Sequence, residues 1–320
     1  MSNLNVAVIG PEGYAQDLGK KGTSSDITFY NLKKGDNTIT FLEPARYPER
    51  LASLFFSVSM AARAILVVDE INAAFGECLI MLDCAGIRKG ILVLRNYITP
   101  EQIAPLIQGT VVEHYRLLPD DRMRIREELI AEIEAVKEPD QIRDHGAVPV
   151  DHFFNVKGIG VVVLGEVIGG RICRHETLRV HPTKKTALVR SIQKHDDDAE
   201  YAIPGDRVGL ALKGIETEDL DRGYVLSAST DITSSSLING RANLVRYWPS
   251  PLKEGMVLHA GLWMQFIPAR IAFVDNSGDW KKPVITLRTE SELVYRPGAR
   301  VILHYLEGGK LRVAGTIVLE

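Results

Sequence analysis

The sequence predicts an α/β domain with a mostly parallel sheet, followed by two antiparallel β-barrels. Three observations predict this fold class. In residues 1–137, short apolar runs alternate with amphipathic stretches, as strands and helices do in α/β domains. From about residue 148 the hydrophobic period changes to two and helical periodicity disappears. A Ser- and Thr-rich stretch, Thr230–Ser236, divides this second half and indicates a joint between two barrels.

The composition is that of a globular protein. The 320 residues are 45% hydrophobic and 25% charged, which excludes a disordered chain. No apolar run reaches the roughly 18 residues that a membrane-spanning helix needs, so we expect no membrane partner. The N-terminal residues lack a basic stretch followed by an apolar one, so we expect no secretory signal and a cytoplasmic location.

Cysteine usage and charge exclude further classes. The three cysteines show no spacing for zinc, and we expect Cys78 and Cys84 to be core residues. The net charge of −3 is not that of a typical DNA-binding protein. Residues 1–147 carry 16 Lys and Arg against 21 Asp and Glu, whereas residues 148–320 carry 22 against 20. A polyanionic partner is therefore expected at the C-terminal half.

Strands and helices of the α/β domain follow from the spacing of apolar residues. Continuous apolar runs predict buried strands at 5–10, 64–69 and 90–94. Alternating segments at 26–32 and 37–43 predict a hairpin. Helical patterns lie near 47–63, 75–86 and 100–107, and the last helix begins at Pro119-Asp120 and stops at Glu138-Pro139.

The β-rich half is predicted from short alternating segments that Gly, Pro and Asp residues separate. These segments are 160–168, 177–181, 187–193 and 207–212. The stretch Glu138–Val148, which contains Pro139 and Gly146, is the expected linker. We therefore expect an α/β domain at 1–145, a first barrel at 146–235 and a second barrel at 236–320.

A family resemblance appears in the β-rich half. Residues 149–167 read Pro-Val-Asp-His-Phe-Phe-Asn-Val-Lys-Gly-Ile-Gly-Val-Val-Val-Leu-Gly-Glu-Val, and further matches lie at 189–193, 202–208, 212–215 and Arg222-Gly223. These stretches resemble domain 2 of the EF-Tu/SelB translational GTPases, in the order and spacing of archaeal SelB. Residues 251–320 resemble domain 3, mainly at 259–271 and 311–315. The resemblance implies that residues 1–145 form a P-loop-type G domain.

The phosphate-binding motif of that domain is degenerate. A P-loop reads GxxxxGK(S/T), in which backbone N–H groups surround the phosphates, Lys neutralises them and the hydroxyl binds Mg²⁺. At 10–17 the second glycine is replaced by Ala15, the lysine by Gln16 and the hydroxyl by Asp17. Backbone groups of 10–13, ahead of a helix N-terminus, could still hold a phosphate. Lys20 or Lys21 could reach it if the loop were rearranged.

The other nucleotide motifs are altered as well. The first switch motif survives partly at 21–24, with Ser24 at the place of the Mg²⁺-binding threonine. The second reads Glu43-Pro44-Ala45-Arg46-Tyr47, in which Glu43 replaces an aspartate, Arg46 the switching glycine and Tyr47 the water-positioning histidine. The guanine-reading motif is Arg95-Asn96-Tyr97-Ile98, with no carboxylate at its last position.

These losses predict little or no GTP hydrolysis, because phosphoryl transfer depends on the parts that are missing. We assign no catalytic residue and no metal ligand. We expect GTP or GDP at reduced affinity, with Mg²⁺ only alongside the nucleotide. The candidate nucleotide-binding residues are Gly10, Pro11, Glu12, Gly13, Tyr14, Lys20, Lys21, Ser24, Arg95 and Asn96.

The resemblance implies a translation elongation factor homologue that binds an aminoacyl-tRNA, with the ribosome as a further candidate partner. Asp151, His152 and Arg207 correspond to SelB positions that line the pocket for the aminoacyl group, where an Asp carboxylate could pair with the α-amino group. The chain resembles a SelB-like branch of methanogen proteins with a degenerate G domain. Two alternatives stay open. One is an active GTPase that uses Lys20, Lys21, Ser24 and Glu43; the other is a pseudo-GTPase scaffold resembling the gamma subunit of archaeal initiation factor two.

Overall fold

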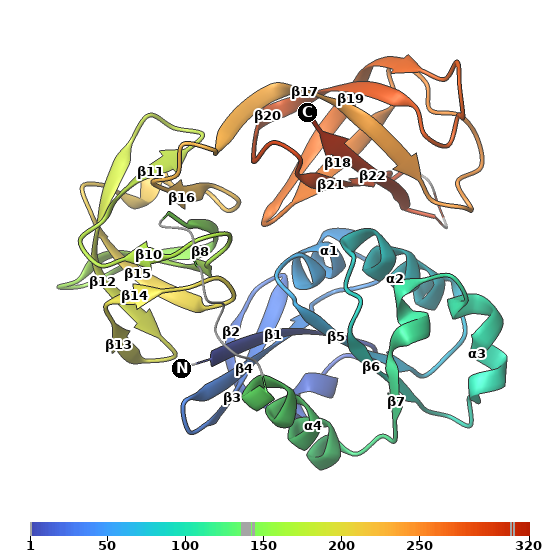
Figure 1. Cartoon of the computed structure of the whole chain (residues 1–320), viewed down its shortest axis with the longest axis horizontal. Helices are drawn as coiled ribbons and strands as arrows, with labels where there is room; N and C mark the ends of the chain where they lie inside the picture. Colours follow the sequence, from blue (N-terminus) through green and yellow to red (C-terminus); the bar gives the residue numbers. More distant parts are fainter. Residues whose placement is uncertain (1, 136–141, 143–144, 308, 310) are drawn as a thin grey trace. The chain divides into compact units, whose positions relative to one another are not determined.

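The computed structural model describes residues 2–135, 142, 145–307, 309 and 311–320 (Figure 1). The described chain forms two compact units. The first contains the residues up to 135 together with those of the loop 306–313. The second contains the β-rich remainder. In the expected linker 138–148, residues 138–141, 143 and 144 lie outside the described part of the chain.

A twisted sheet in the order β2-β3-β4-β1-β5-β6-β7 forms the centre of the first unit. Strands β4, β1, β5, β6 and β7 run parallel, whereas β3 is antiparallel to β4 and β2 to β3. The strands are β1 (Ser2–Ile9), β2 (Lys20–Ser24), β3 (Ile27–Lys34), β4 (Asn37–Pro44), β5 (Arg63–Val68), β6 (Gly90–Leu94) and β7 (Arg116–Leu118). The parallel sheet and the hairpin that the sequence predicts are confirmed.

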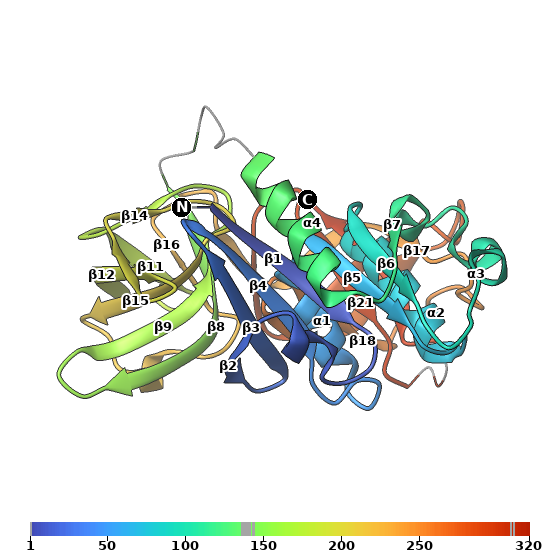
Figure 2. The same cartoon turned by 90° about the horizontal axis from the view of Figure 1, so that it is seen from below.

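Helices cover both faces of this sheet. They are α1 (Leu51–Ser59), α2 (Ala73–Ala85), α3 (Pro100–Ile107) and α4 (Arg122–Ala135). Helix α4 covers one face and buries Ile125 and Leu129 against β1, β4 and β5, while α1 and α2 lie on the opposite face (Figures 1 and 2). Local sequence sets the helix ends: Asn72 accepts a hydrogen bond from the Phe75 amide at the start of α2, and Asp121 caps α4.

Short turns of 3₁₀ helix complete the connections, namely η1 (Tyr14–Asp17), η2 (Val111–His114) and, in the second unit, η3 (Thr217–Asp219). The first of these stands where the sequence predicted the N-terminus of a phosphate-binding helix. Helical geometry ends after the four residues of η1, and the chain enters β2 at Lys20. The expected helix N-terminus is therefore wrong, because Gly19 and the exposed segment after it continue into the hairpin sheet instead.

The first barrel of the second unit closes in the order β11-β16-β8-β9-β15-β12, with β12 pairing back onto β11. Its strands are β8 (Ala147–Val156), β9 (Gly160–Glu166), β11 (Thr177–His181), β12 (Thr186–Lys194), β15 (Arg207–Lys213) and β16 (Val225–Ser227). Short strands flank it, namely β10 (Ile172–Cys173), β13 (Asp197–Ala199) and β14 (Tyr201–Ala202). Alternate residues point inward and form one apolar core, which Val163 and Leu210 exemplify.

The second barrel closes in the order β17-β20-β19-β18-β21-β22. Its strands are β17 (Thr233–Leu244), β18 (Val257–Leu262), β19 (Gln265–Asp275), β20 (Val284–Tyr295), β21 (Arg300–His304) and β22 (Val313–Leu319). A small apolar cluster that includes Val225, Ile232 and Val294 joins the two barrels within the unit. The predicted fold class, an α/β domain followed by two antiparallel barrels, is confirmed.

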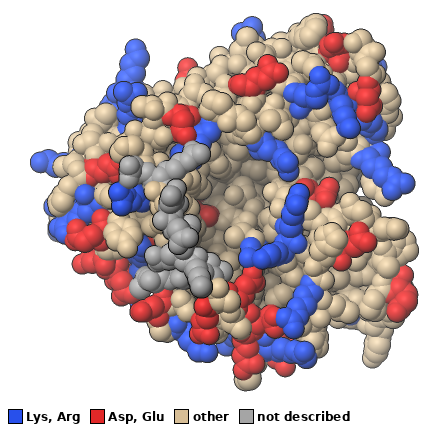
Figure 3. Space-filling model, in the orientation of Figure 1, with Lys and Arg blue, Asp and Glu red and all other residues tan. Residues whose placement is uncertain are grey.

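Surface charge is mixed. On the face that Figure 3 shows, Lys and Arg side chains are interspersed with Asp and Glu. Cys78 and Cys84 are buried, as expected. Among the described residues, no helix is long and apolar enough to span a membrane.

Candidate functional site

The carboxyl ends of the parallel strands bring the altered nucleotide motifs to one edge of the sheet. The loop 10–17 follows β1, Glu43 lies at the end of β4, and Arg95 directly follows β6. Strand β1 lies between β4 and β5, so this edge is the topological switch point where open α/β sheets bind ligands. The 10–17 segment, Glu43 and Arg95 therefore lie at one edge of the sheet.

Two glycines shape the loop after β1, which we call the 10–17 loop. A Cβ atom at Gly10 would lie 2.6 Å from the Val67 Cβ, so only glycine lets the loop leave the sheet here. Gly13 has φ of 82°, in the left-handed region that glycine adopts without strain. The chain then enters η1, and the successive amides of Gly13, Tyr14 and Ala15 converge on one acceptor.

That acceptor is the carboxylate of Glu43. It receives hydrogen bonds from the backbone N–H groups of Gly13, Tyr14 and Ala15, and from the Tyr30 hydroxyl. Glu43 is buried, with 6% of its surface exposed. Burial raises the pKa of the Glu43 carboxyl, and the hydrogen bonds that it accepts act against that rise. The amides of this loop are thus satisfied by a side chain of the same unit.

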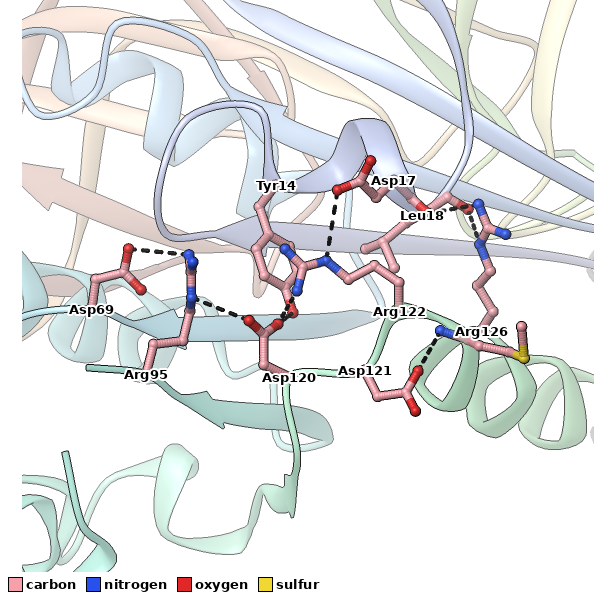
Figure 4. A network of polar contacts seen from close by, with 10 residues as sticks. Tyr14, Asp17, Leu18, Asp69, Arg95, Asp120, Asp121, Arg122 and Arg126 are labelled. Atoms are coloured by element: carbon pink, nitrogen blue, oxygen red, sulfur yellow. Dashed lines mark hydrogen bonds and ion pairs between the residues drawn. The ribbon is translucent and has the colours of Figure 1, made fainter. Parts of the chain in front are cut away.

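The Tyr14 side chain is held on the other side of the loop (Figure 4). Its hydroxyl donates a hydrogen bond of 2.9 Å to Asp120 Oδ1, and Tyr14 is 3% exposed. The Arg122 guanidinium lies over its ring, 3.7 Å from the centroid, and also pairs with Asp120. Burial, followed by the hydrogen bond to Asp120, raises the pKa of Tyr14. Tyr14 is therefore anchored to the residues that follow β7.

The guanine-reading position is engaged in the same network (Figure 4). Arg95 Nε lies 3.2 Å from Asp120 Oδ2, and its Nη1 lies 3.3 Å from Asp69 Oδ2. Asn96 donates a hydrogen bond of 3.1 Å to the Asp69 carbonyl. Both candidate residues thus bind neighbours at the strand ends, and Ile98 offers no side-chain acceptor for a base.

The remaining nucleotide candidates do not converge on the 10–17 loop amides. Lys20 and Lys21 lie exposed on β2, paired in register with Asn31 and Tyr30 of β3. The Ser24 hydroxyl is exposed and lies 3.0 Å from the Thr28 hydroxyl. Pro11 and Glu12 form the turn before Gly13, and Glu12 is exposed. The residues that the structure describes do not fit a nucleoside triphosphate with Mg²⁺, since Glu43 occupies the amide donors and none of the described Lys or Arg side chains pairs with Glu43.

In the altered second switch motif, Tyr47 is bonded to residues of helix α2. The Tyr47 hydroxyl lies 2.9 Å from the Ala74 carbonyl and 3.1 Å from Glu77 Oε2, and it accepts a hydrogen bond from the Cys78 thiol at 3.4 Å. Burial raises the pKa of Cys78 to about 12. Glu77, in turn, binds Arg312 through two hydrogen bonds of 2.9 and 2.5 Å. Tyr47 is thus a structural side chain at the place of a water-positioning histidine.

Arg46 occupies a backbone conformation that favours glycine, with φ of 60° and an exposed side chain. Replacing Arg46 with glycine is expected to raise the free energy of unfolding of the first unit by about 1 kcal/mol, because the left-handed strain disappears. Urea unfolding followed by far-ultraviolet circular dichroism measures this, because helices α1–α4 lie in that unit. Arg46→Ala is the control and should give no gain. An equal gain from both changes would contradict the strain argument.

A second site lies on the first barrel, where the structure brings Asp151, His152 and Arg207 together. A β-bulge at Asp151 shifts the β8–β9 register between Val150 and His152. Arg207, the first residue of β15, binds both carboxylate oxygens of Asp151, with Nη2 at 3.1 Å from Oδ1. His152 Nδ1 lies 2.7 Å from the same oxygen. The three side chains therefore form one cluster.

The three side chains of this cluster differ in how far they are exposed. The Asp151 side chain is 0% exposed, whereas the side chains of His152 and Arg207 are 18% and 11% exposed. Burial works against ionisation of Asp151, but Arg207 and His152 outweigh it and lower the pKa of the carboxyl. The direct pairing of Asp151 with an α-amino group is therefore not available, because its carboxylate is enclosed. The residues that reach the surface are His152 and Arg207.

Sequence reasoning missed several partners. Arg222 Nε donates a hydrogen bond of 3.2 Å to the Asp151 carbonyl, and Arg222 was quoted only as part of a matching stretch. Asp69 and Asp120 also join the nucleotide edge, where both pair with Arg95. Each of these acidic residues stands at or just after the end of a parallel strand, which is the signal that could have identified them.

Comparison with protein families gives a match to elongation factor Tu domain 2 over residues 160–227. An uncharacterized protein of Methanocaldococcus jannaschii is 37% identical over 98% of this chain and 99% of its own length. The selenocysteine-specific elongation factor of the same organism is 24% identical over 83% of this chain, and that of Desulfomicrobium baculatum is 27% identical over 72%. These matches span 61% and 39% of the two factors.

Solved structures show the same fold. Translation elongation factor SelB from Methanococcus maripaludis is 21% identical and covers this whole chain, with a TM-score of 0.82 for the apo form. Its complex with the GTP analogue GPPNHP gives a TM-score of 0.84. The sequence matches and this fold agree with the resemblance that residues 149–223 carry. The chain therefore belongs to the SelB/EF-Tu-like family of translational GTPases, alongside the archaeal SelB proteins.

Proposed function

We propose that this protein is a translation elongation factor homologue that carries an aminoacyl-tRNA, with weakened guanine-nucleotide binding and little or no GTP hydrolysis. One contrast carries the proposal. The cluster around Asp151 on the first barrel is complete and closely bonded, whereas the donors of the 10–17 loop are already engaged by Glu43. In this proposal the residues for binding the aminoacyl end are kept, whereas the residues for binding the nucleotide are altered.

In the barrel site, we assign the contact with the aminoacyl end to His152 and Arg207. Asp151 acts as a positioning residue, because its carboxylate bonds to the side chains of both His152 and Arg207 and so fixes their orientation. A guanidinium group has a fixed set of donors that suits a phosphate or an anionic side chain. An ester that is enclosed against this surface would be shielded from water, and its spontaneous hydrolysis would slow.

At the nucleotide edge, the expected weakness has a chemical cause. A bound nucleotide would have to displace the Glu43 carboxylate from three amides, without a loop lysine to compensate. Hydrolysis would further need Mg²⁺ and a water-orienting side chain, and Tyr47 is bonded to Glu77 and Ala74 instead. The lack of a carboxylate at Ile98 should also weaken the preference for guanine over adenine.

A deacylation assay tests the carrier function. The protein is expected to slow the spontaneous hydrolysis of the ester in charged tRNA without added nucleotide. Protection should weaken as salt rises, because contacts with the phosphate backbone release counterions. Protein denatured by heat is the control. If no charged tRNA is protected at low salt, the carrier proposal fails and the scaffold takes its place.

A hydrolysis assay run in parallel addresses the other alternative. We expect no Mg²⁺-dependent release of phosphate from GTP above that of buffer. Robust release that Lys20→Ala or Lys21→Ala abolishes would contradict this expectation and would favour an active GTPase with a rearranged site. Peripheral lysines of the second unit, such as Lys157, supply matched charge removals that should leave the release of phosphate unchanged.

A further inference from the structure

The 10–17 loop has the architecture of an anion-binding loop. A left-handed Gly13 followed by a turn of 3₁₀ helix aims successive amides at one point, an arrangement that forms a concave site for anions. The amides of Gly13, Tyr14 and Ala15 all bond to the same carboxylate. In a phosphate-binding loop, such amides surround the oxygens of a phosphate.

The position of Glu43 explains how its carboxylate reaches these amides. Strand β4 is a direct neighbour of β1 in the sheet, so the end of β4 lies beside the start of the loop. Glu43 is paired with Thr28 of β3, which fixes its place along the strand. Its side chain is one methylene longer than the aspartate of the family motif. The carboxylate can therefore extend into the loop.

The loop is also held through its side chains. Tyr14 bonds to Asp120 and lies beneath Arg122, and Arg126 donates hydrogen bonds of 2.6 and 2.9 Å to the carbonyls of Asp17 and Leu18 (Figure 4). Leu18 is fully buried in the core against α4. Contacts on both sides of the loop thus come from the protein itself.

We propose that Glu43 is a built-in ligand of the 10–17 loop, whose carboxylate takes the place that a phosphate occupies in a nucleotide-binding loop. The loop is consequently folded in the absence of nucleotide. Removal of the carboxylate exposes a site for a small oxyanion, and inorganic phosphate is the simplest member of that class. This inference rests on the weakened nucleotide binding of the proposed function and gives it a structural cause. It does not depend on any contact with tRNA.

Hydrogen exchange with inorganic phosphate tests the proposal. In the full-length Glu43→Ala protein, the amides of Gly13 and Ala15 are expected to exchange about tenfold faster or more than in the wild type, because they lose their acceptor. Phosphate should restore protection in this variant and leave the wild-type loop unchanged. Glu49→Ala is the matched control, since Glu49 is an exposed glutamate of the same unit outside the loop, and exchange of the loop amides in this variant should equal that of the wild type.

Several results would overturn the proposal: unchanged exchange in Glu43→Ala, equal protection of the wild-type loop by phosphate, or no restoration in the variant. If Glu43→Ala speeds exchange throughout the first unit, Glu43→Gln replaces it, because the amide keeps the shape and removes the charge. The loop should then lose part of its protection, with the rest of the unit unchanged, because the NH2 group of glutamine cannot accept hydrogen bonds from the loop amides. Because the assay contains no tRNA, a negative outcome leaves the carrier function to be decided by the deacylation assay alone.

Discussion

Replacing Asp151 with alanine is expected to abolish most of the discrimination between charged and uncharged tRNA and to destabilise the first barrel by about 3–5 kcal/mol. The stability loss follows because the Arg207 side chain, which is only 11% exposed, is left without its carboxylate partner. Discrimination should fall about tenfold or more, because His152 and Arg207 lose the group that orients them and a charge-assisted hydrogen bond is worth about 1.5–3 kcal/mol. Filter binding of both tRNA forms, at a temperature where the variant is folded, measures the effect.

A second buried ion pair of the same barrel supplies the matched control. Lys194 Nζ lies 2.5 Å from Asp206 Oδ2. Lys194→Met should lower the free energy of unfolding by an amount comparable with Asp151→Ala, and it should leave the discrimination between charged and uncharged tRNA unchanged. Trp248, Trp263 and Trp280 all lie in the second unit, so tryptophan fluorescence reports its unfolding. If both variants lose stability and neither loses discrimination, Asp151 only braces the barrel.

The pKa of Asp151 gives this prediction a pH dependence. Its carboxyl has a lower pKa in the folded protein than in the unfolded chain, where it is about 3.9. The stabilisation is therefore present above about pH 4 and is lost as the pH falls through the folded-state pKa. The difference in unfolding free energy between the wild type and Asp151→Ala should be constant near neutral pH and should shrink in acid.

Replacing Arg312 with alanine is expected to destabilise the first unit by about 3–5 kcal/mol. Glu77 is 4% exposed on α2, and Arg312 binds both of its carboxylate oxygens. Without Arg312 a buried carboxylate would remain with no cation to balance it. Chemical unfolding followed by the helical band in circular dichroism measures the loss, whereas tryptophan fluorescence reports the other unit.

Two further variants distinguish the contribution of the Glu77–Arg312 ion pair to stability from that of the neighbouring hydrogen bonds. Tyr47→Phe removes one hydroxyl from the same network and should cost only about 1 kcal/mol. Combining Glu77→Gln with Arg312→Ala should recover part of the loss, because the buried charge is removed together with its partner. If Arg312→Ala costs no more than Tyr47→Phe, the ion pair does not contribute as the structure indicates.

The sequence predicted the fold class because its signals are local. Apolar runs and period-two segments are long enough to identify β1, the β3–β4 hairpin, β5, β6 and most strands of the first barrel. Within the first unit, the elements that were missed are short: β2 has five residues, η1 four and β7 three. Periodicity cannot be recognised over so few positions. For the same reason, the helix expected after Gly13 was not distinguished from a single turn.

The sequence motifs identified residues of the candidate site, but they did not identify the residues to which these side chains bond. The motifs placed Gly13, Tyr14 and Arg95 at one edge, yet Tyr14 binds Asp120, which lies 106 positions away in the chain. Likewise the resemblance grouped Asp151 with Arg207, but only the bulge in β8 determines that the carboxylate faces inward. Partners of this kind depend on tertiary contacts between distant residues, which a single sequence does not contain.

The most direct test of the account is the affinity for an aminoacyl-tRNA, measured with and without GTP and Mg²⁺ in the same buffer. Glu43 engages the loop amides, and the barrel site is held together by Asp151, His152 and Arg207 alone, none of which belongs to the nucleotide edge. We therefore predict tight binding of charged tRNA in the absence of nucleotide, with an affinity ratio near one when GTP is added. An increase of about tenfold or more on addition of GTP would correspond to a coupling of about 1.4 kcal/mol and would contradict the account.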